Sequence, residues 1–130
     1  MISTDHSIIK GKETLIAELG YWPEFCDAKI HELVFCPYSD NGARLSLMLH
    51  YIDMDLNRDL NIRVIFHDVL DLNFNELRTE NVIDRLSIED SFVVEIEAAT
   101  GLSGCCKCKA IEVEVITSKP YSVDLGQRRQ

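Results

Sequence analysis

The side chains in this sequence best suited to acid–base or nucleophilic chemistry occur in three parts of the chain: Cys26, Asp27 and His31, then His50, then His67 and Asp68. Nucleophilic catalysis needs a nucleophile within hydrogen-bond reach of a base that a third group orients. Asp27 and His31 would share one face of a helix, but their segment has the pattern of a strand, where the two side chains diverge. The sequence contains no nucleophile elbow, phosphate-binding loop or metalloprotease helix motif. We therefore expect no catalytic residues and no enzymatic activity.

Metal binding is a second kind of chemistry that these residue types suggest. Cys106 and Cys108 supply two thiols on one face of a predicted strand, so Cys26 and His31 would have to complete a zinc site. Structural zinc sites more commonly use two spaced cysteine pairs. His50 and His67, on neighbouring predicted strands, would instead form a cross-strand pair. We expect no metal and no cofactor, and we keep a metal-binding or small-molecule-binding module as the alternative interpretation.

The composition indicates a single domain with a protein partner. The chain has 130 residues, 46% of them hydrophobic, and a formal net charge of −9. This charge argues against nucleic acid and anionic membranes, which bind clustered Lys and Arg, and favours a basic protein, although solubility alone is an equal explanation. No apolar run reaches the ~18 residues of a spanning helix, and the N-terminal residues lack a signal-peptide pattern. We expect a cytoplasmic protein, one domain over residues 1–130, with its five cysteines reduced.

One helix and one corner begin the predicted fold. Residues 12–19 carry apolar side chains at helical spacing, and Gly20 stands where a C-cap belongs. Pro23 lacks an amide hydrogen and disfavours helical geometry at Trp22. The helix must therefore end before this point, and Trp22 and Phe25 become available to anchor the chain onto a sheet.

Most of residues 28–117 is predicted to form β-strands. Residues 43–52 alternate apolar and polar side chains, and residues 62–69 have the pattern of a central strand. Residues 29–35 alternate less regularly, which predicts a β-bulge near Glu32, and Asn41-Gly42 predicts a hairpin turn.

Two further segments complete the prediction. Residues 74–87 have no clear period and fit a short helix or a strand, and the tail at residues 125–130 is expected to fray. The predicted class is α+β and mainly antiparallel β, a curved sheet or sandwich-like meander with one short N-terminal helix.

The last predicted hairpin carries the candidate partner-binding residues. Residues 91–117 alternate on both sides of a turn at residues 100–104, so the two halves are expected to pair. That pairing would bring together four outward glutamates: Glu95, Glu97, Glu112 and Glu114. Like charges facing across strands destabilise a sheet by roughly a few tenths of a kcal/mol or more per pair. Such a stripe indicates a basic partner; an ordinary solvated face is the other interpretation.

Several short motifs resemble one protein family. Trp22-Pro23-Glu-Phe25, followed by Asp27-Ala, is similar to the Trp-Pro-x-Phe-His-Asp-Ala entry of the immunity protein 50 family from bacterial polymorphic toxin systems. Segments similar to the family's middle and end occur later in the chain, at Phe74-Asn75, Asn81-Val82-Ile83, Ile88 and Cys108 to Val113. The resemblance covers roughly residues 15–117. One departure is Cys26, where the family pattern has His.

The resemblance implies a small, mostly β protein that binds a cognate toxin domain and neutralises it as a stoichiometric inhibitor. It implies no catalytic residues, and it makes Trp22, Pro23, Phe25 and Asp27 a structural motif. A homo-oligomer that uses an open edge strand is a further alternative, because a meander leaves edges unpaired.

Overall fold

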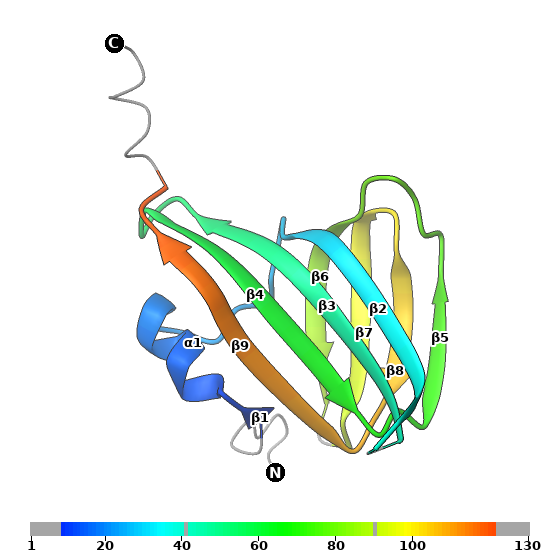
Figure 1. Ribbon diagram of the computed structural model, residues 1–130. Coiled ribbons are helices and arrows are strands. Elements are labelled where there is room, and N and C mark those ends of the chain that lie inside the picture. The colour runs from blue at the N-terminus through cyan, green and yellow to red at the C-terminus, as the bar shows by residue number, and fades with distance from the viewer. Residues whose placement is uncertain (1–8, 41, 90, 122–130) are drawn as a thin grey trace.

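The computed structural model describes residues 9–40, 42–89 and 91–121, which form one nine-stranded sheet and one short helix (Figure 1). In chain order the elements are β1 (Ile9–Lys10), α1 (Lys12–Leu19), β2 (Lys29–Ser39), β3 (Gly42–Asp53), β4 (Arg58–His67), β5 (Asp71–Asn75), β6 (Val82–Ile88), β7 (Val93–Thr100), β8 (Ser103–Lys107) and β9 (Ala110–Lys119). The order across the sheet is β1-β9-β4-β3-β2-β6-β7-β8-β5. Among the described strands, β1 and β9 run parallel, and every other neighbouring pair is antiparallel. The predicted fold class is confirmed.

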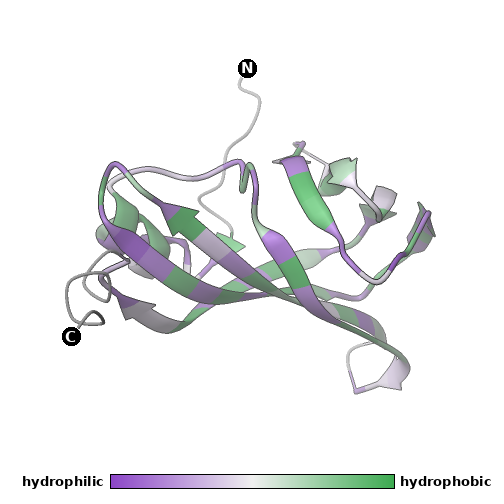
Figure 2. Ribbon diagram, turned by 90° about the horizontal axis from the view of Figure 1, so that it is seen from above, coloured by the Kyte–Doolittle hydropathy of each residue, from purple (hydrophilic) through white to green (hydrophobic). Residues whose placement is uncertain are grey.

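The sheet curves strongly, so that β9, β4, β3 and β2 lie across β6, β7 and β8 (Figure 1). Hydrophobic and hydrophilic residues alternate along the strands (Figure 2), and the apolar ones turn toward the space between the two halves. Leu47 from β3, Val64 from β4 and Val94 from β7 are almost fully buried in one core. The curvature thus lets a single sheet enclose its own core. No helix in the described part of the chain has the length and apolar character needed to cross a membrane.

The helix α1 occupies the residues that the apolar spacing predicts. Leu15 and Leu19 are buried against the core, and the helix contacts β9. Gly20 adopts a left-handed conformation at the C-cap, and its N–H donates to the Ile16 carbonyl at 2.6 Å. A glycine accepts this conformation without steric cost. The helix therefore ends by a standard glycine cap.

The corner after the helix is built from aromatic contacts. Trp22 packs edge-on against Phe25, with ring centroids 6.3 Å apart, and Phe25 packs edge-on against Tyr51 of β3 at 5.6 Å. Phe25 is buried although its φ is 61°, and Asp27 also has a positive φ, 69°. The Asp27 N–H donates to the Ile83 carbonyl at 2.7 Å. These contacts fasten the corner to β3 and β6.

The hairpins β2–β3 and β3–β4 follow the predicted pattern. The register between β2 and β3 shifts between Ile30 and Glu32, which confirms the bulge, and Ser39 pairs with Gly42 across the turn. Asn41 lies outside the described residues. β2 is longer than the alternation suggested and contains Pro37, near a second register shift. β4 lies between β3 and β9, as expected for a central strand.

The expected hairpin over residues 91–117 is wrong. β7 turns instead into the short strand β8, with Ile96 opposite Gly104, and β9 pairs with β4 and β1. The chain leaves β8 at Cys108, whose N–H donates to the Phe92 carbonyl, and the next N–H, of Lys109, donates to the His67 carbonyl at the end of β4. These bonds direct β9 to the other half of the sheet.

Two remaining segments complete the comparison with the sequence. The undecided region 74–87 contains the end of β5 and most of β6, so it forms strands rather than a helix. The tail expected to fray, residues 125–130, lies outside the described residues.

Candidate partner-binding surface

A hydroxyl–carboxylate network lies at the end of the sheet next to the aromatic corner. The Tyr21 hydroxyl donates to Asp53 Oδ2 at 2.6 Å, and it lies 2.7 Å from the Tyr51 hydroxyl. Because Tyr21 has one proton and the carboxylate can only accept, Tyr51 donates to Tyr21. The Tyr21 bond lowers the pKa of Asp53, whereas burial, and then the bond to Asp53, raise the pKa of Tyr21. The network ties the chain after α1 to the end of β3.

Acidic side chains surround the exposed thiol of Cys26 at the same corner. Burial of the thiol group and the charges of Asp27, Asp84 and Glu24 raise the pKa of Cys26. No basic side chain forms an ion pair with any of these three carboxylates among the described residues. The hydrogen bond to Glu97, and then the nearby charges of Glu24 and Asp84, raise the pKa of Arg85, but the ion pair of Arg85 is with Glu97. This part of the surface therefore keeps a net negative charge.

The four glutamates expected to form one stripe are divided between two strands that do not pair. Glu97 on β7 accepts from Arg85 at 3.1 Å. On β9, Glu112 lies 3.0 Å from His67, and Glu114 lies 3.5 Å from Arg63. Glu95 stands opposite Ser87 and Cys105. The glutamates of β7 therefore do not face those of β9, and the cross-strand repulsion inferred from the sequence is absent, because the two strands belong to different parts of the sheet.

The alternative zinc site is not assembled. Cys26 is exposed on the corner beside the start of β6, whereas Cys106 is buried opposite Val94, near the other end of β6 and β7. Cys108 donates to the Phe92 carbonyl at 3.9 Å, and its contact with Cys106 and its burial raise its pKa, which favours the neutral thiol. No group of three or more His, Cys, Asp or Glu side chains in residues 9–40, 42–89 and 91–121 could hold a metal ion.

The histidines also differ from their predicted arrangement. His50 pairs across the sheet with Asn61, and His67 pairs with Arg44, so the two histidines lie near opposite ends of the β3–β4 ladder. His50 instead contacts Asp59 at 2.7 Å, and its ring packs edge-on against His31 at 5.4 Å. Asp68 forms an ion pair with Lys109 at 3.7 Å.

The remaining members of the nucleophile–base set are equally scattered. Cys26 and Asp27 are exposed at the corner, and Asp68 follows β4 at the far end of the strand. The structure does not bring a nucleophile, a base and an orienting acid into one cluster from these residues.

Sequence reasoning missed the free edge of β2. β2 pairs with β6 only where Lys29 meets Val82, so the edge from Glu32 to Ser39 faces no strand in the described part of the chain. Three large side chains of this stretch are exposed: Val34 by 47%, Phe35 by 42% and Tyr38 by 92%. The sequence contains one signal of this open edge: no Lys or Arg occurs from residue 30 to 43. Edge strands are commonly protected by such charges.

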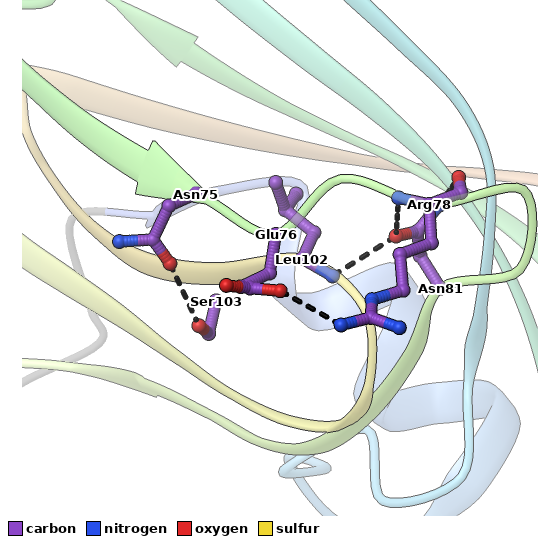
Figure 3. Close-up of polar contacts among 6 residues, drawn as sticks. All are labelled: Asn75, Glu76, Arg78, Asn81, Leu102 and Ser103. Atoms are coloured by element: carbon purple, nitrogen blue, oxygen red, sulfur yellow. Dashed lines mark hydrogen bonds and ion pairs between the residues drawn. The ribbon is translucent and has the colours of Figure 1, made fainter.

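A polar network beside the hollow at the β5–β6 connection is structural. Asn81 accepts from the N–H groups of Arg78 and Leu102 at 3.1 and 2.9 Å and donates to the Arg78 carbonyl at 2.8 Å (Figure 3). Arg78 also pairs with Glu76 at 2.8 Å. The adjoining hollow, of about 540 Å³, is open and lined partly by Arg78 and Ser103. Most of the polar side chains beside this hollow already form hydrogen bonds or ion pairs with one another.

Comparison with known proteins places this architecture in a family. No curated protein and no solved structure matches the chain. The family model described as Immunity protein 50 matches residues 11–119, which run from the residue before α1 to the end of β9. Because this match covers most of the sequence and nearly all of the described sheet, the chain belongs to the immunity protein 50 family.

Proposed function

We propose that this protein binds a cognate polymorphic toxin domain in the cytoplasm of a toxin-producing bacterium and neutralises it as a stoichiometric inhibitor. Membership of the immunity protein 50 family is the observation that carries this proposal. An inhibitor of this kind acts through a surface that covers or locks the toxin, so it needs no catalytic group of its own.

The surface charge supports a basic toxin. The chain carries a net charge of −9, and Glu24, Asp27 and Asp84 lie near Cys26 without forming an ion pair among the described residues. A charged surface speeds association with a partner of opposite charge and makes the rate sensitive to salt. Aromatic side chains next to the acids, such as Trp22, add apolar area of the kind that interfaces favour.

The glutamates on β7 and β9 are not equally available to a basic partner. Glu95 has no ion pair among the described residues, so a basic partner would meet its full charge. Glu97, Glu112 and Glu114 already contact Arg85, His67 and Arg63, and a partner would have to compete with those contacts. We therefore propose Glu95 as the strongest contact of the four.

The family resemblance implies that the cognate toxin is encoded beside its immunity protein, so co-expression with the product of the neighbouring gene tests the function. We expect a stoichiometric complex that survives size-exclusion chromatography, loss of the toxin's effect on cell growth, and an association rate that falls as salt is raised. A toxin that remains active when this protein is present in excess would refute the proposal.

Charge reversal locates the acidic contact within the same complex. Glu95→Lys should slow association, whereas Glu13→Lys, which places the same charge change on α1, should change it less. Equal effects of the two variants would show that net charge matters and that the β7 position does not.

A further inference from the structure

The edge of β2 offers hydrogen-bonding groups that the fold leaves unused. After Lys29 pairs with Val82, β2 runs away from β6, as Figure 1 shows for the cyan strand. The stretch from Glu32 to Cys36 pairs with β3 in continuous register on one side and with no described strand on the other. In an antiparallel strand, alternate residues direct their N–H and C=O groups to each side. The outward groups of this stretch are therefore available to another strand.

The side chains beside this edge are apolar on both faces of the sheet. Val34 lies opposite Ser46, whereas Phe35 lies opposite the buried Leu45, so the two side chains point to opposite faces. Both remain more than 40% exposed, because no described strand covers this side of β2. An added strand would pair its backbone with β2 and cover apolar side chains on each face at the same time.

Two bulges limit where such a strand can pair. Register shifts occur between Ile30 and Glu32 and again between Cys36 and Ser39, and Pro37 lies within the second. Bulges and proline interrupt regular pairing along an edge. They leave one short regular stretch, which selects a strand of matching length and register and opposes open-ended aggregation.

The charges around this stretch identify the occupant as a strand of another protein. Glu32 and Asp40 are the acidic residues near its two ends, no Lys or Arg occurs from residue 30 to 43, and the preceding Lys29 pairs with Glu80 at 3.5 Å. An antiparallel pairing of two copies over Glu32–Cys36 would bring two edges with only acidic charges together, and two chains of net charge −9 would repel each other. A strand with an apolar middle and a cationic side chain at either end complements this edge.

We propose that β2 accepts such a strand from the toxin domain and extends the nine-stranded sheet to ten strands in the complex. This inference rests on the proposed function, and it assigns the contact to Glu32–Cys36 with Val34, Phe35 and Tyr38 as the flanking apolar groups. Backbone pairing supplies the affinity, while the two bulges and the terminal acids set the register.

Hydrogen–deuterium exchange of the complex with the neighbouring gene's product tests the inference. We expect the amides of residues 32–36 that point away from β3 to exchange at least about tenfold more slowly in the complex than in the free protein. Val34→Lys should weaken the complex about tenfold or more, because a lysine beside an edge disfavours strand addition. Leu77→Lys is the control: it also replaces an exposed aliphatic side chain by lysine, at a residue that is 64% exposed in the β5–β6 connection, and it should leave affinity unchanged.

The outcomes separate this inference from the function on which it depends. A stoichiometric, neutralising complex in which residues 32–36 exchange as fast as in the free protein overturns the strand-addition inference and leaves the inhibitor function standing. Absence of any complex with an active toxin overturns both. Protection of the same residues in the free protein, together with a dimeric mass in light scattering, would assign the edge to a second copy and overturn the inference as well.

Discussion

The hydroxyl of Tyr21, two residues after the helix, donates to the carboxylate of Asp53 at the end of β3 at 2.6 Å, and this bond lowers the pKa of Asp53. It joins two segments that are 32 residues apart in sequence. A carboxylate held this way stabilises the fold while it is ionised, because protonation weakens the bond. The relationship makes the attachment of the aromatic corner dependent on pH.

Tyr21→Phe should therefore destabilise the protein in a pH-dependent way. The folded pKa of Asp53 lies below its ordinary value, so the stabilisation is present above about pH 4 and is lost as the pH falls through the folded pKa. Urea unfolding at pH 7 should give a free energy of unfolding about 1 kcal/mol lower for the variant than for the wild type, and this difference should become smaller below pH 4. Tyr51→Phe is the control, since it keeps the Tyr21–Asp53 bond and should retain the pH dependence of the wild type. An equal loss at all pH values in Tyr21→Phe would contradict the assignment.

Asn81→Ala should be one of the most damaging polar substitutions. Its side chain is almost fully buried and satisfies the N–H groups of Arg78 and Leu102 and the Arg78 carbonyl (Figure 3). Removing the amide leaves several of these groups without partners, at a cost of about 2–4 kcal/mol in the free energy of unfolding. Chemical denaturation measures this loss. Asn75→Ala removes only an exposed contact with Ser103 and should cost under about 0.5 kcal/mol.

Gly11→Ala and Gly20→Ala should differ although both glycines have a positive φ. A methyl group at Gly11 would overlap the backbone carbonyl oxygen of Val113 in β9, whereas one at Gly20 would meet open space. Gly20→Ala should cost about 1 kcal/mol from backbone strain alone. Gly11→Ala adds a steric conflict with a central strand and should cost about 3 kcal/mol. Thermal unfolding of the two variants tests the difference, and equal losses would mean that α1 can shift away from β9 at little cost.

Cys26 should be slow to alkylate for an exposed thiol. Its raised pKa reduces the thiolate fraction, and Asp27, Asp84 and Glu24 contribute to that shift after burial. Iodoacetamide labelling at pH 8, followed by mass spectrometry, should show about a twofold faster reaction in Asp84→Asn than in the wild type. Glu13→Gln, a neutralisation on α1, should leave the rate unchanged. An unaltered rate in Asp84→Asn would remove this carboxylate from the causes of the slow reaction.

Local patterns in the sequence were sufficient for the elements and several of their details. The apolar spacing before Gly20 predicted α1, because helix periodicity and a glycine cap act within a few residues. The irregular alternation around Glu32 predicted the bulge in β2, because a shift of one residue changes which side chains can face the core. The motif around Trp22 also pointed to the immunity protein 50 family, which the match over residues 11–119 confirmed.

Strand pairing was the step that local patterns could not decide. Alternation in residues 110–119 tells which side chains face the core but is the same whether β9 pairs with β7 or with β4. The choice depends on non-local contacts, such as the Lys109 bond to the His67 carbonyl and the packing of α1 on β9. The predicted glutamate stripe failed for this reason, since Glu97 and Glu114 acquired basic partners from strands that the sequence did not place beside them.

The sequence by itself determined the class of the fold, the helix, the corner and the family, because each depends on residue types and short-range spacing. Only the tertiary structure decided which strand edge stays open. β2 is exposed between Glu32 and Ser39 because its sheet neighbour β6 meets it at a single pair, Lys29 with Val82. That divergence follows from the curvature of the whole sheet, which arises from packing both halves around one core and is not encoded in any one segment.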